Sequence, residues 1–229
     1  MMKNRTDSRK KIGLLTIGQS PRVDVTEEIW DMLADRAELL EMGALDGLKK
    51  EEISALEPDI GSSVLVTRLR DGSYVKLGEE KILPLMEEKI RLLEAEGAQL
   101  IVLLCTGTFP DFQAGVPLIY PQKLLLELVP SFTEGRCIAV VNPSADQLGQ
   151  SLEKWGGAFQ NVLSMSCNPY DGAPGLSELG RKIRSTDAEL AVLDCIGYTK
   201  EMQEELQAAA GIPVILPRIL TAAVIRGFL

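Results

Sequence analysis

The sequence of 229 residues predicts an α/β protein with two lobes, each a mostly parallel sheet between layers of helices. Short apolar runs alternate with amphipathic segments from end to end, as expected when crossover helices connect parallel strands. The apolar runs are continuous and rich in leucine and β-branched residues, which is typical of strands buried on both faces. A Pro- and Gly-rich stretch, residues 110–121, is the best candidate for a crossing between the lobes.

In the first half of the chain, each predicted element has a local signal. Residues 12–17 form a buried strand closed by Gly18, and residues 24–36 carry apolar side chains at helical spacing. The turn signal Asp71-Gly72 predicts a hairpin between its two flanking strands. The remaining elements expected here are a strand at 37–42, a short helix at 49–56, hairpin strands at 64–69 and 74–77, a long helix at 79–96 and a strand at 100–104.

The second half repeats this alternation. Its predicted strands are residues 137–141, 162–165, 191–193 and 214–216. Its predicted helices are residues 122–128, 144–155, 176–185, 200–209 and 219–228.

The composition excludes several classes of function. The chain has no histidine, which rules out a Ser-His-Asp triad and a histidine zinc site within it. Its 33 acidic and 24 basic residues give a net charge of −9, which disfavours nucleic acid as a partner. The four cysteines are scattered, so neither a disulfide framework nor metal-ligand spacing is expected. The polar first eleven residues and the shortness of every apolar run predict a cytoplasmic protein without a membrane segment.

The loop after the first predicted strand is rich in hydrogen-bond donors. Gly18 lets the backbone approach a ligand, Gln19 and Ser20 supply donors, and Arg22 is able to hold a carboxylate bidentately. Ligands of parallel α/β sheets collect at such strand ends, so these four residues are candidate substrate-binding residues. The alternative is a strand-to-helix turn in which this loop only starts the next helix.

Two further loops each place a cysteine at the end of an apolar strand, followed by glycine and hydroxyl residues. One contains Cys105, Thr106, Gly107 and Thr108, and the other contains Cys195, Gly197 and Tyr198. The cysteines are 195 − 105 = 90 residues apart, so equivalent loops from two similar lobes would face each other across a cleft. The alternative for either cysteine is that of a small buried hydrophobic residue.

Other candidates are single residues. Asn142, in the loop after the strand at 137–141, is able to bind a substrate oxygen, although Asn-Pro-Ser is also ordinary turn chemistry. Arg68, with Arg70 beside the hairpin turn, is able to supply a cation to a lid, although solvated hairpin arginines are commoner. Cys137 is expected in the core, and Cys167 is a minor site candidate.

A pair of thiols suits proton transfer at a carbon next to a carboxylate. One group removes a proton and the other returns one on the opposite face, so one must be a base while the other is an acid. Cysteine fits because helix dipoles and cations bring its thiolate within reach near neutral pH. Backbone N–H groups, hydroxyls and an arginine would hold the carboxylate, and no metal or organic cofactor is required.

At these residues the sequence resembles the AroM family, in TIGQSPR at 16–22 and LDCIGY at 193–198, and also in EMGALDG at 41–47 and VTRLRDG at 66–72. More distantly it is similar to the aspartate/glutamate/hydantoin racemase superfamily. That resemblance implies two pseudo-two-fold related αβα lobes, with Cys105 and Cys195 as the acid/base pair at the cleft between them. It implies a flexible tail at 1–11 and an AroM-like domain at 12–229, with one lobe at about 12–110 plus the C-terminal helix and the other at 111–216.

This chain departs from those racemases beside both cysteines. Many of them follow the first cysteine with Asn-Thr and carry a histidine beside the second, whereas this chain has Thr106-Gly107 and Ile196-Gly197. Any proton relay must therefore be different here.

Three functions are consistent with these patterns. The first is a cofactor-independent racemase or isomerase that uses both cysteines on a small carboxylate. The second is a decarboxylase or cis–trans isomerase of the same superfamily that uses one cysteine. The third is a non-catalytic metabolite-binding protein linked to aromatic amino-acid biosynthesis. In each case the partner is a small carboxylate, with neither nucleic acid nor membrane, and a homodimer is one candidate state of the chain.

Overall fold

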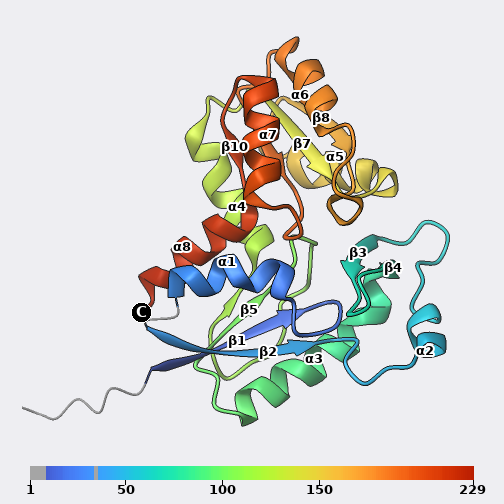
Figure 1. Cartoon of the computed structure of the whole chain (residues 1–229), viewed down its shortest axis with the longest axis vertical. Helices are drawn as coiled ribbons and strands as arrows, with labels where there is room; N and C mark the ends of the chain where they lie inside the picture. The colour runs from blue at the N-terminus through green and yellow to red at the C-terminus, as the bar shows by residue number, and fades with distance from the viewer. Residues whose placement is uncertain (1–8, 34–35) are drawn as a thin grey trace, which may run out of the picture.

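The computed structural model describes residues 9–33 and 36–229. The predicted tail therefore lies mostly outside the described residues, as do two positions near the end of the helix predicted at 24–36. Within this part of the chain, the strands form two four-stranded parallel sheets and one antiparallel hairpin (Figure 1). The predicted α/β class with mostly parallel sheets is confirmed.

The first sheet belongs to the lobe that we call the N-lobe. Its order is β2-β1-β5-β6, formed by β1 (Lys10–Thr16), β2 (Ala37–Gly43), β5 (Leu100–Leu103) and β6 (Leu118–Ile119). The helices of this lobe are α1 (Val23–Leu33), α2 (Lys50–Ser54) and α3 (Glu79–Ala95). The hairpin strands are β3 (Val64–Arg68) and β4 (Tyr74–Gly78), on either side of the predicted Asp71-Gly72 turn.

The second sheet belongs to the lobe that we call the C-lobe. Its order is β10-β9-β7-β8, formed by β7 (Cys137–Asn142), β8 (Asn161–Ser166), β9 (Leu190–Leu193) and β10 (Val214–Ile215). Its helices are α4 (Pro121–Leu128), α5 (Leu148–Gly156), α6 (Leu176–Arg184) and α7 (Lys200–Ala210). Short 3₁₀ turns cover Val129–Phe132, Ala145–Gln147 and Pro169–Asp171.

Each sheet is covered on both faces, which explains the continuous apolar runs. In the N-lobe, one face of β1 and β5 packs on α3, and the other packs on α1 and α8 (Pro217–Gly227). In the C-lobe, one face of β7 and β9 packs on α6 and α7, and the other packs around Leu125 and Trp155. Strands β5, β7 and β9 are buried at every position.

The last helix, α8, connects the two lobes by packing on the N-lobe after the chain leaves the C-lobe sheet. The chain leaves the C-lobe sheet after β10 and enters α8, which packs against α1 of the N-lobe (Figure 1). Ile196, from the loop after β9, lies in the same apolar cluster as Ala222 and Ile225 of α8. The carboxyl ends of both sheets are thereby brought to the boundary between the lobes.

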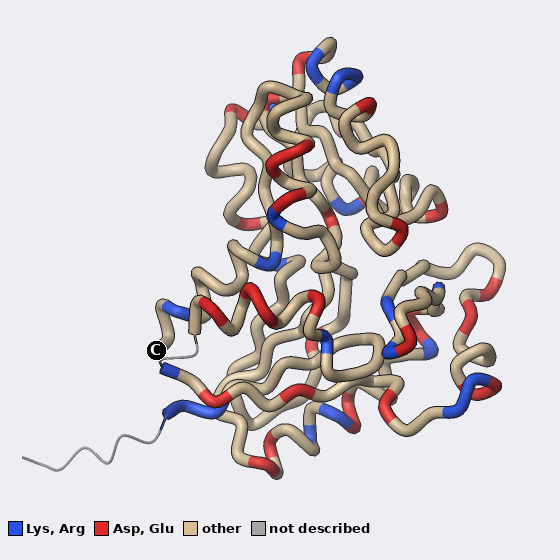
Figure 2. Tube along the Cα trace, viewed as in Figure 1, with Lys and Arg blue, Asp and Glu red and all other residues tan. Residues whose placement is uncertain are grey.

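Apart from shifts of a few residues at element ends, the structure differs from the prediction in one helix and adds one strand. The segment 144–155 is divided, because Ser144 caps a 3₁₀ turn and the α-helix starts only at Leu148. Strand β6 was not predicted, since its two residues lie between prolines and pair with β5 only through the tertiary fold. Figure 2 shows acidic and basic residues interspersed over both lobes in the described part of the chain. No helix within residues 9–33 and 36–229 has the length and apolar character needed to cross a membrane.

Candidate active site

The loops that carry Cys105 and Cys195 meet where the two lobes touch. The hydroxyl of Thr106, next to Cys105, donates a hydrogen bond of 3.0 Å to the carbonyl oxygen of Asp194, next to Cys195. The Nζ of Lys154 on α5 bridges the same two loops, donating to the carbonyl oxygen of Thr106 at 2.7 Å and to the Asp194 carboxylate. The sequence therefore places its two strand-end cysteines in loops that are in direct contact across the lobe boundary.

The two cysteines share one local geometry. Each sulfur accepts a hydrogen bond from the backbone N–H two residues later, at 3.3 Å from Gly107 and at 3.4 Å from Gly197. Each cysteine N–H in turn donates to the carbonyl oxygen two residues earlier, at 2.8 Å for Cys105 and 2.7 Å for Cys195. The two thiol loops are therefore built alike, one in each lobe.

Both glycines are required by close packing. A Cβ on Gly107 would lie 2.5 Å from a methyl carbon of Leu65, and a Cβ on Gly197 would lie 2.6 Å from the ring of Tyr170. Real Cβ atoms do not approach other groups this closely, so a side chain at either position would displace its neighbour. The Cys-x-Gly spacing thus has a structural reason in both loops.

Burial opposes ionisation of both thiols. Burial is the largest cause that raises the pKa of Cys105, to about 12. Negative charge at Cys195 also raises this pKa, whereas the hydrogen bond from the Gly107 N–H and the charge of Lys154 lower it. Burial also raises the pKa of Cys195, against which the Gly197 N–H, the Tyr170 hydroxyl and Arg22 act. Because ionisation of one thiol raises the pKa of the other, the two sulfurs titrate as interacting groups.

Arg22 lies at the boundary with its guanidinium already paired. Its side chain is 4% exposed, and Nε and Nη2 each donate to one carboxylate oxygen of Asp24 at 2.8 Å. Burial lowers the pKa of Arg22, but the hydrogen bond and charge of Asp24 outweigh this and raise it. A carboxylate ligand would have to share this guanidinium with Asp24 or displace it.

The other candidates of the first loop are engaged within the N-lobe. Gln19 Oε1 accepts a hydrogen bond of 2.9 Å from the N–H of Arg70, and the Ser20 hydroxyl donates to the Asp46 carboxylate at 2.5 Å. A Cβ on Gly18 would collide with Thr67 and the backbone of Arg68, so this loop is packed on the hairpin. The Arg68 side chain is 40% exposed, and its Nη1 lies 3.9 Å from Asp24.

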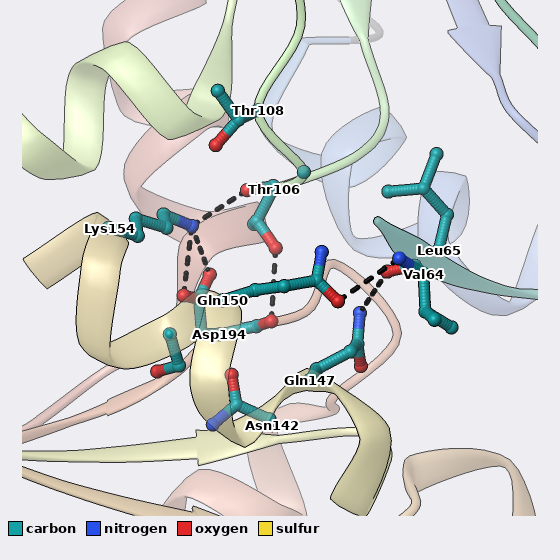
Figure 3. Close-up of a pocket in the computed structure, with 11 residues that line it drawn as sticks. Val64, Leu65, Thr106, Thr108, Asn142, Gln147, Gln150, Lys154 and Asp194 are labelled. Atoms are coloured by element: carbon teal, nitrogen blue, oxygen red, sulfur yellow. Dashed lines mark hydrogen bonds and ion pairs between the residues drawn. The ribbon is translucent and has the colours of Figure 1, made fainter. Parts of the chain in front are cut away.

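A cavity of about 50 Å³ lies beside the Cys105 loop, between β3 and α5 (Figure 3). Three predicted residues of that loop, Thr106, Gly107 and Thr108, line it together with Asn142. The side-chain amide of Asn142 donates within its own sheet, to Ser164 Oγ at 3.1 Å and to the Met165 carbonyl oxygen at 3.0 Å.

Polar side chains of α5 and of Gln147, the residue before it, complete this cavity, and they are not among the sequence candidates. Gln147 and Gln150 hold the backbone of Val64 at 3.0 Å each, which closes the hairpin onto the C-lobe (Figure 3). Lys154 is paired with both Asp194 oxygens at 2.8 Å, and Ser151 Oγ is buried with no hydrogen-bond partner among the described residues. Positions 147, 150, 151 and 154 have the spacing of one helical face, a signal visible in the sequence.

Tyr170 is a second missed residue. It lies in the 3₁₀ turn after β8, with its hydroxyl 3.6 Å from Cys195 Sγ and its ring centroid 5.7 Å from the Arg22 guanidinium carbon. Its ring also stacks on that of Tyr74 in the hairpin, with centroids 6.4 Å apart. The available signal was its place in a loop after a strand, as with the other candidate loops.

The remaining sequence candidates serve packing. Tyr198 is fully buried, and its hydroxyl donates to the carbonyl oxygen of Cys167. The Cys167 thiol in turn donates to the Pro174 carbonyl oxygen at 3.3 Å. Cys137 is 5% exposed inside β7, as expected for a core residue. In residues 9–33 and 36–229, no three Cys, Asp or Glu side chains are grouped so that they could hold a metal ion.

Comparison with solved structures defines the fold class. The chain is similar to allantoin racemase from Klebsiella pneumoniae at 16% identity and a TM-score of 0.61, with 96% of this chain and 87% of that chain covered. It is similar to glutamate racemase from Francisella tularensis in complex with D-glutamate, at 12% identity, a TM-score of 0.60 and coverage of 97% and 81%. It is also similar to a liganded double mutant of arylmalonate decarboxylase, at 15% identity, a TM-score of 0.60 and coverage of 95% and 93%. The protein therefore has the aspartate/glutamate racemase fold.

The sequence places the chain within a particular family. The AroM family, described as AroM protein, matches residues 12–229, and the chain belongs to this family. No curated protein sequence matches it.

Proposed function

We propose that this AroM-family protein is an isomerase of racemase type that acts without a cofactor on a small carboxylate, with Cys105 and Cys195 as its acid/base pair. The observation that carries the proposal is the direct contact of two identically built thiol loops, one from each lobe. The fold is that of enzymes named as racemases and a decarboxylase, which is consistent with this chemistry.

In the proposed reaction, one sulfur is a thiolate and the other a thiol when the substrate binds. The thiolate removes the proton from the carbon next to the carboxylate, and the thiol returns its own proton to the opposite face. The charge that develops on the carboxylate is stabilised by donors that line the boundary, for which we propose the guanidinium of Arg22 and the hydroxyls of Thr106 and Thr108. The backbone at Gly107 and Gly197 and the side chain of Asn142 would complete the pocket.

The proposed substrate requires the boundary to open. The cavity lined by Thr106, Gly107 and Thr108 has about 50 Å³ and its lining includes neither cysteine, whereas small-molecule sites usually have ~300 Å³ or more. The hairpin is attached to the C-lobe by hydrogen bonds of Gln147 and Gln150 to Val64 and by the ion pair of Lys76 with Asp146. The Tyr74 ring of the hairpin also stacks on the Tyr170 ring of the C-lobe. We propose that these contacts separate when a ligand enters.

The test is exchange of solvent deuterium into a panel of amino acids and other 2-substituted acids. We expect the wild type to label at least one acid, and Cys105→Ala and Cys195→Ala each to lose at least about 100-fold of that rate, in the range of acid–base catalysis. Cys137→Ala is the matched control and should retain the wild-type rate, because Cys137 lies inside β7. Absence of exchange with every acid, or unchanged exchange in both active-site variants, would refute the proposal.

The second candidate function is a decarboxylase or cis–trans isomerase that uses one cysteine. The unequal surroundings of the thiols favour it, since the Tyr170 hydroxyl is near Cys195 and the described contacts of Cys105 include no such donor. In the same assay it predicts a severe loss for one cysteine variant and a mild loss for the other. Release of CO₂ from a malonate-type acid would identify the decarboxylase.

A further inference from the structure

Tyr170 occupies a prepared position between the lobes. Its N–H donates to the Asn168 side chain at 2.9 Å, and the 3₁₀ turn ends at Gly172 with a positive φ of 75°. Its ring lies directly on Gly197, where a Cβ would meet it at 2.6 Å. Because the loop geometry and the bare glycine both hold the ring in place, the position of its hydroxyl is well determined.

The side chain of Tyr170 contacts one of the two thiols through its hydroxyl and a cation through its ring. It lies 3.6 Å from Cys195 Sγ, within hydrogen-bond range for sulfur, while the Arg22 guanidinium carbon is 5.7 Å from the ring centroid. Cys195 therefore has two neighbouring donors, the Tyr170 hydroxyl and the Gly197 N–H at 3.4 Å. A thiolate at Cys195 would accept from both, and the positive charge of Arg22 also favours it.

The environment of Cys105 is less favourable to a negative charge. Its sulfur accepts from the Gly107 N–H at 3.3 Å. The cation that favours its ionisation, Lys154, is paired with Asp194, just as Arg22 is paired with Asp24. The cations alone therefore do not separate the two thiols, and the difference between them is the Tyr170 hydroxyl near Cys195. Negative charge at Cys195 further opposes ionisation of Cys105.

We propose that Tyr170 is a positioning residue that, with Arg22, makes Cys195 the thiol that ionises first, so that Cys195 is the resting base and Cys105 the resting acid. This inference rests on the proposed function for its catalytic meaning. Cys195 loses its proton to solvent, and its thiolate accepts a hydrogen bond from the Tyr170 hydroxyl. The Cys195 thiolate then takes a proton from the substrate carbon, and the Cys105 thiol gives its proton to the opposite face of that carbon. Cys195 is now the thiol and Cys105 the thiolate. Proton exchange with solvent restores the starting state.

Several other titratable groups act on the two thiols. Asp194 and Tyr198 are on the same loop as Cys195, Cys105 lies across the boundary, and Arg218 is on α8. Asp194 opposes ionisation of both cysteines, whereas Arg22 favours ionisation of Cys195 and Lys154 favours that of Cys105. Tyr170 is the neutral donor that distinguishes the two thiols, so its hydroxyl is the group to remove.

The experiment is an NMR titration of full-length protein labelled with ¹³C at the cysteine Cβ. The four cysteine resonances are assigned with single Cys→Ser variants, and Cys137 and Cys167 serve as internal references. No substrate and no thiol reagent are needed, so access to the buried sulfurs does not affect the result. Tyr170→Phe keeps the ring on Gly197 and removes only the hydroxyl, and Tyr74→Phe removes a hydroxyl from the stacked ring as the matched control.

We expect the Cys195 resonance to move toward its thiolate position at lower pH than that of Cys105. Tyr170→Phe should raise the Cys195 midpoint by roughly 0.4–1 pH unit, the shift equivalent to one net hydrogen bond. Tyr74→Phe should leave the Cys195 midpoint unchanged. The proposal is overturned if Cys105 titrates first or together with Cys195, if Cys195 does not titrate while the protein is folded, or if Tyr170→Phe changes nothing.

This outcome is independent of turnover. A titration as expected, in a protein that exchanges deuterium into no acid, would leave the ionisation order standing and remove the proposed function. Deuterium exchange by the wild type, together with a Cys195 midpoint that Tyr170→Phe does not change, would support the proposed function and remove the inference about Tyr170.

Discussion

Replacing Lys154 by methionine tests how strongly one ion pair holds the two thiol loops together. The Lys154 and Asp194 side chains are 10% and 4% exposed, and Nζ lies 2.8 Å from both carboxylate oxygens. The same ammonium reaches the carbonyl oxygen of Thr106 in the N-lobe at 2.7 Å. Methionine keeps the length and apolar stem of the side chain, so the substitution removes the charge with little change in volume.

The expected cost follows from what the substitution leaves behind. Removing one partner of a buried ion pair costs about 3–5 kcal/mol, because the other charge stays buried without compensation. Asp194 retains one donor, the Trp155 indole N–H at 2.9 Å, so we expect a loss near the lower limit, about 3 kcal/mol. The assay is urea unfolding at pH 7, with far-UV circular dichroism as the signal.

A double-mutant cycle separates the ion pair from general damage to the helix. Lys154→Met with Asp194→Asn leaves no uncompensated charge, so we expect a coupling energy of at least about 2 kcal/mol between the two sites. Lys200→Met is the matched control, because Lys200 forms an exposed pair 3.9 Å from Glu204 and should change stability by less than about 0.5 kcal/mol. A loss below about 1 kcal/mol for Lys154→Met, or additive effects in the double variant, would refute the reasoning.

Two further substitutions test the surroundings of Cys195. Burial raises the pKa of Asp24, but the hydrogen bond and charge of Arg22 outweigh burial, so the pKa in the folded protein is lowered. The ionised Asp24 therefore stabilises the fold at pH values above its pKa in the unfolded chain. This stabilisation is lost as the pH falls through its pKa in the folded protein. Asp24→Asn should therefore cost about 1–3 kcal/mol in urea unfolding at pH 7 and less in acid, and a loss independent of pH would contradict the assignment. Gly197→Ala should displace the Tyr170 ring and lower the free energy of unfolding by about 1–3 kcal/mol. Gly157→Ala is the control and should lower it much less, because the space around its Cβ is open. Equal urea midpoints for the two variants would contradict the prediction.

The elements of the fold could be predicted because their signals are local. A strand buried on both faces must be apolar at every position, and β5, β7 and β9 carry that pattern in consecutive residues. The hairpin follows from its turn, since Asp71-Gly72 suits a tight reversal and Gly72 has a φ of 90°. Strand β6 lacks such a signal, because two residues between prolines become a strand only where β5 offers its edge.

The thiol loops were also readable from the sequence, because each repeats the order of apolar strand, cysteine and glycine. The residues that contact these loops could not be predicted from the sequence. Lys154 is 40 residues from Asp194, and Arg22 and Tyr170 come from different lobes, so nothing in the local pattern pairs them. The sequence marked Arg22 as a candidate carboxylate receptor, and only the structure shows that its guanidinium is paired with Asp24.

The sequence by itself thus determined which segments are strands, where they end and which of those ends carry thiols, because burial periodicity and turn chemistry act over a few residues. Only the tertiary structure decided which charges meet at those ends and which thiol receives a donor. The physical reason is that α8 returns from the C-lobe to α1 and closes one lobe against the other, and electrostatic pairing depends on distances in space that the order of residues does not contain.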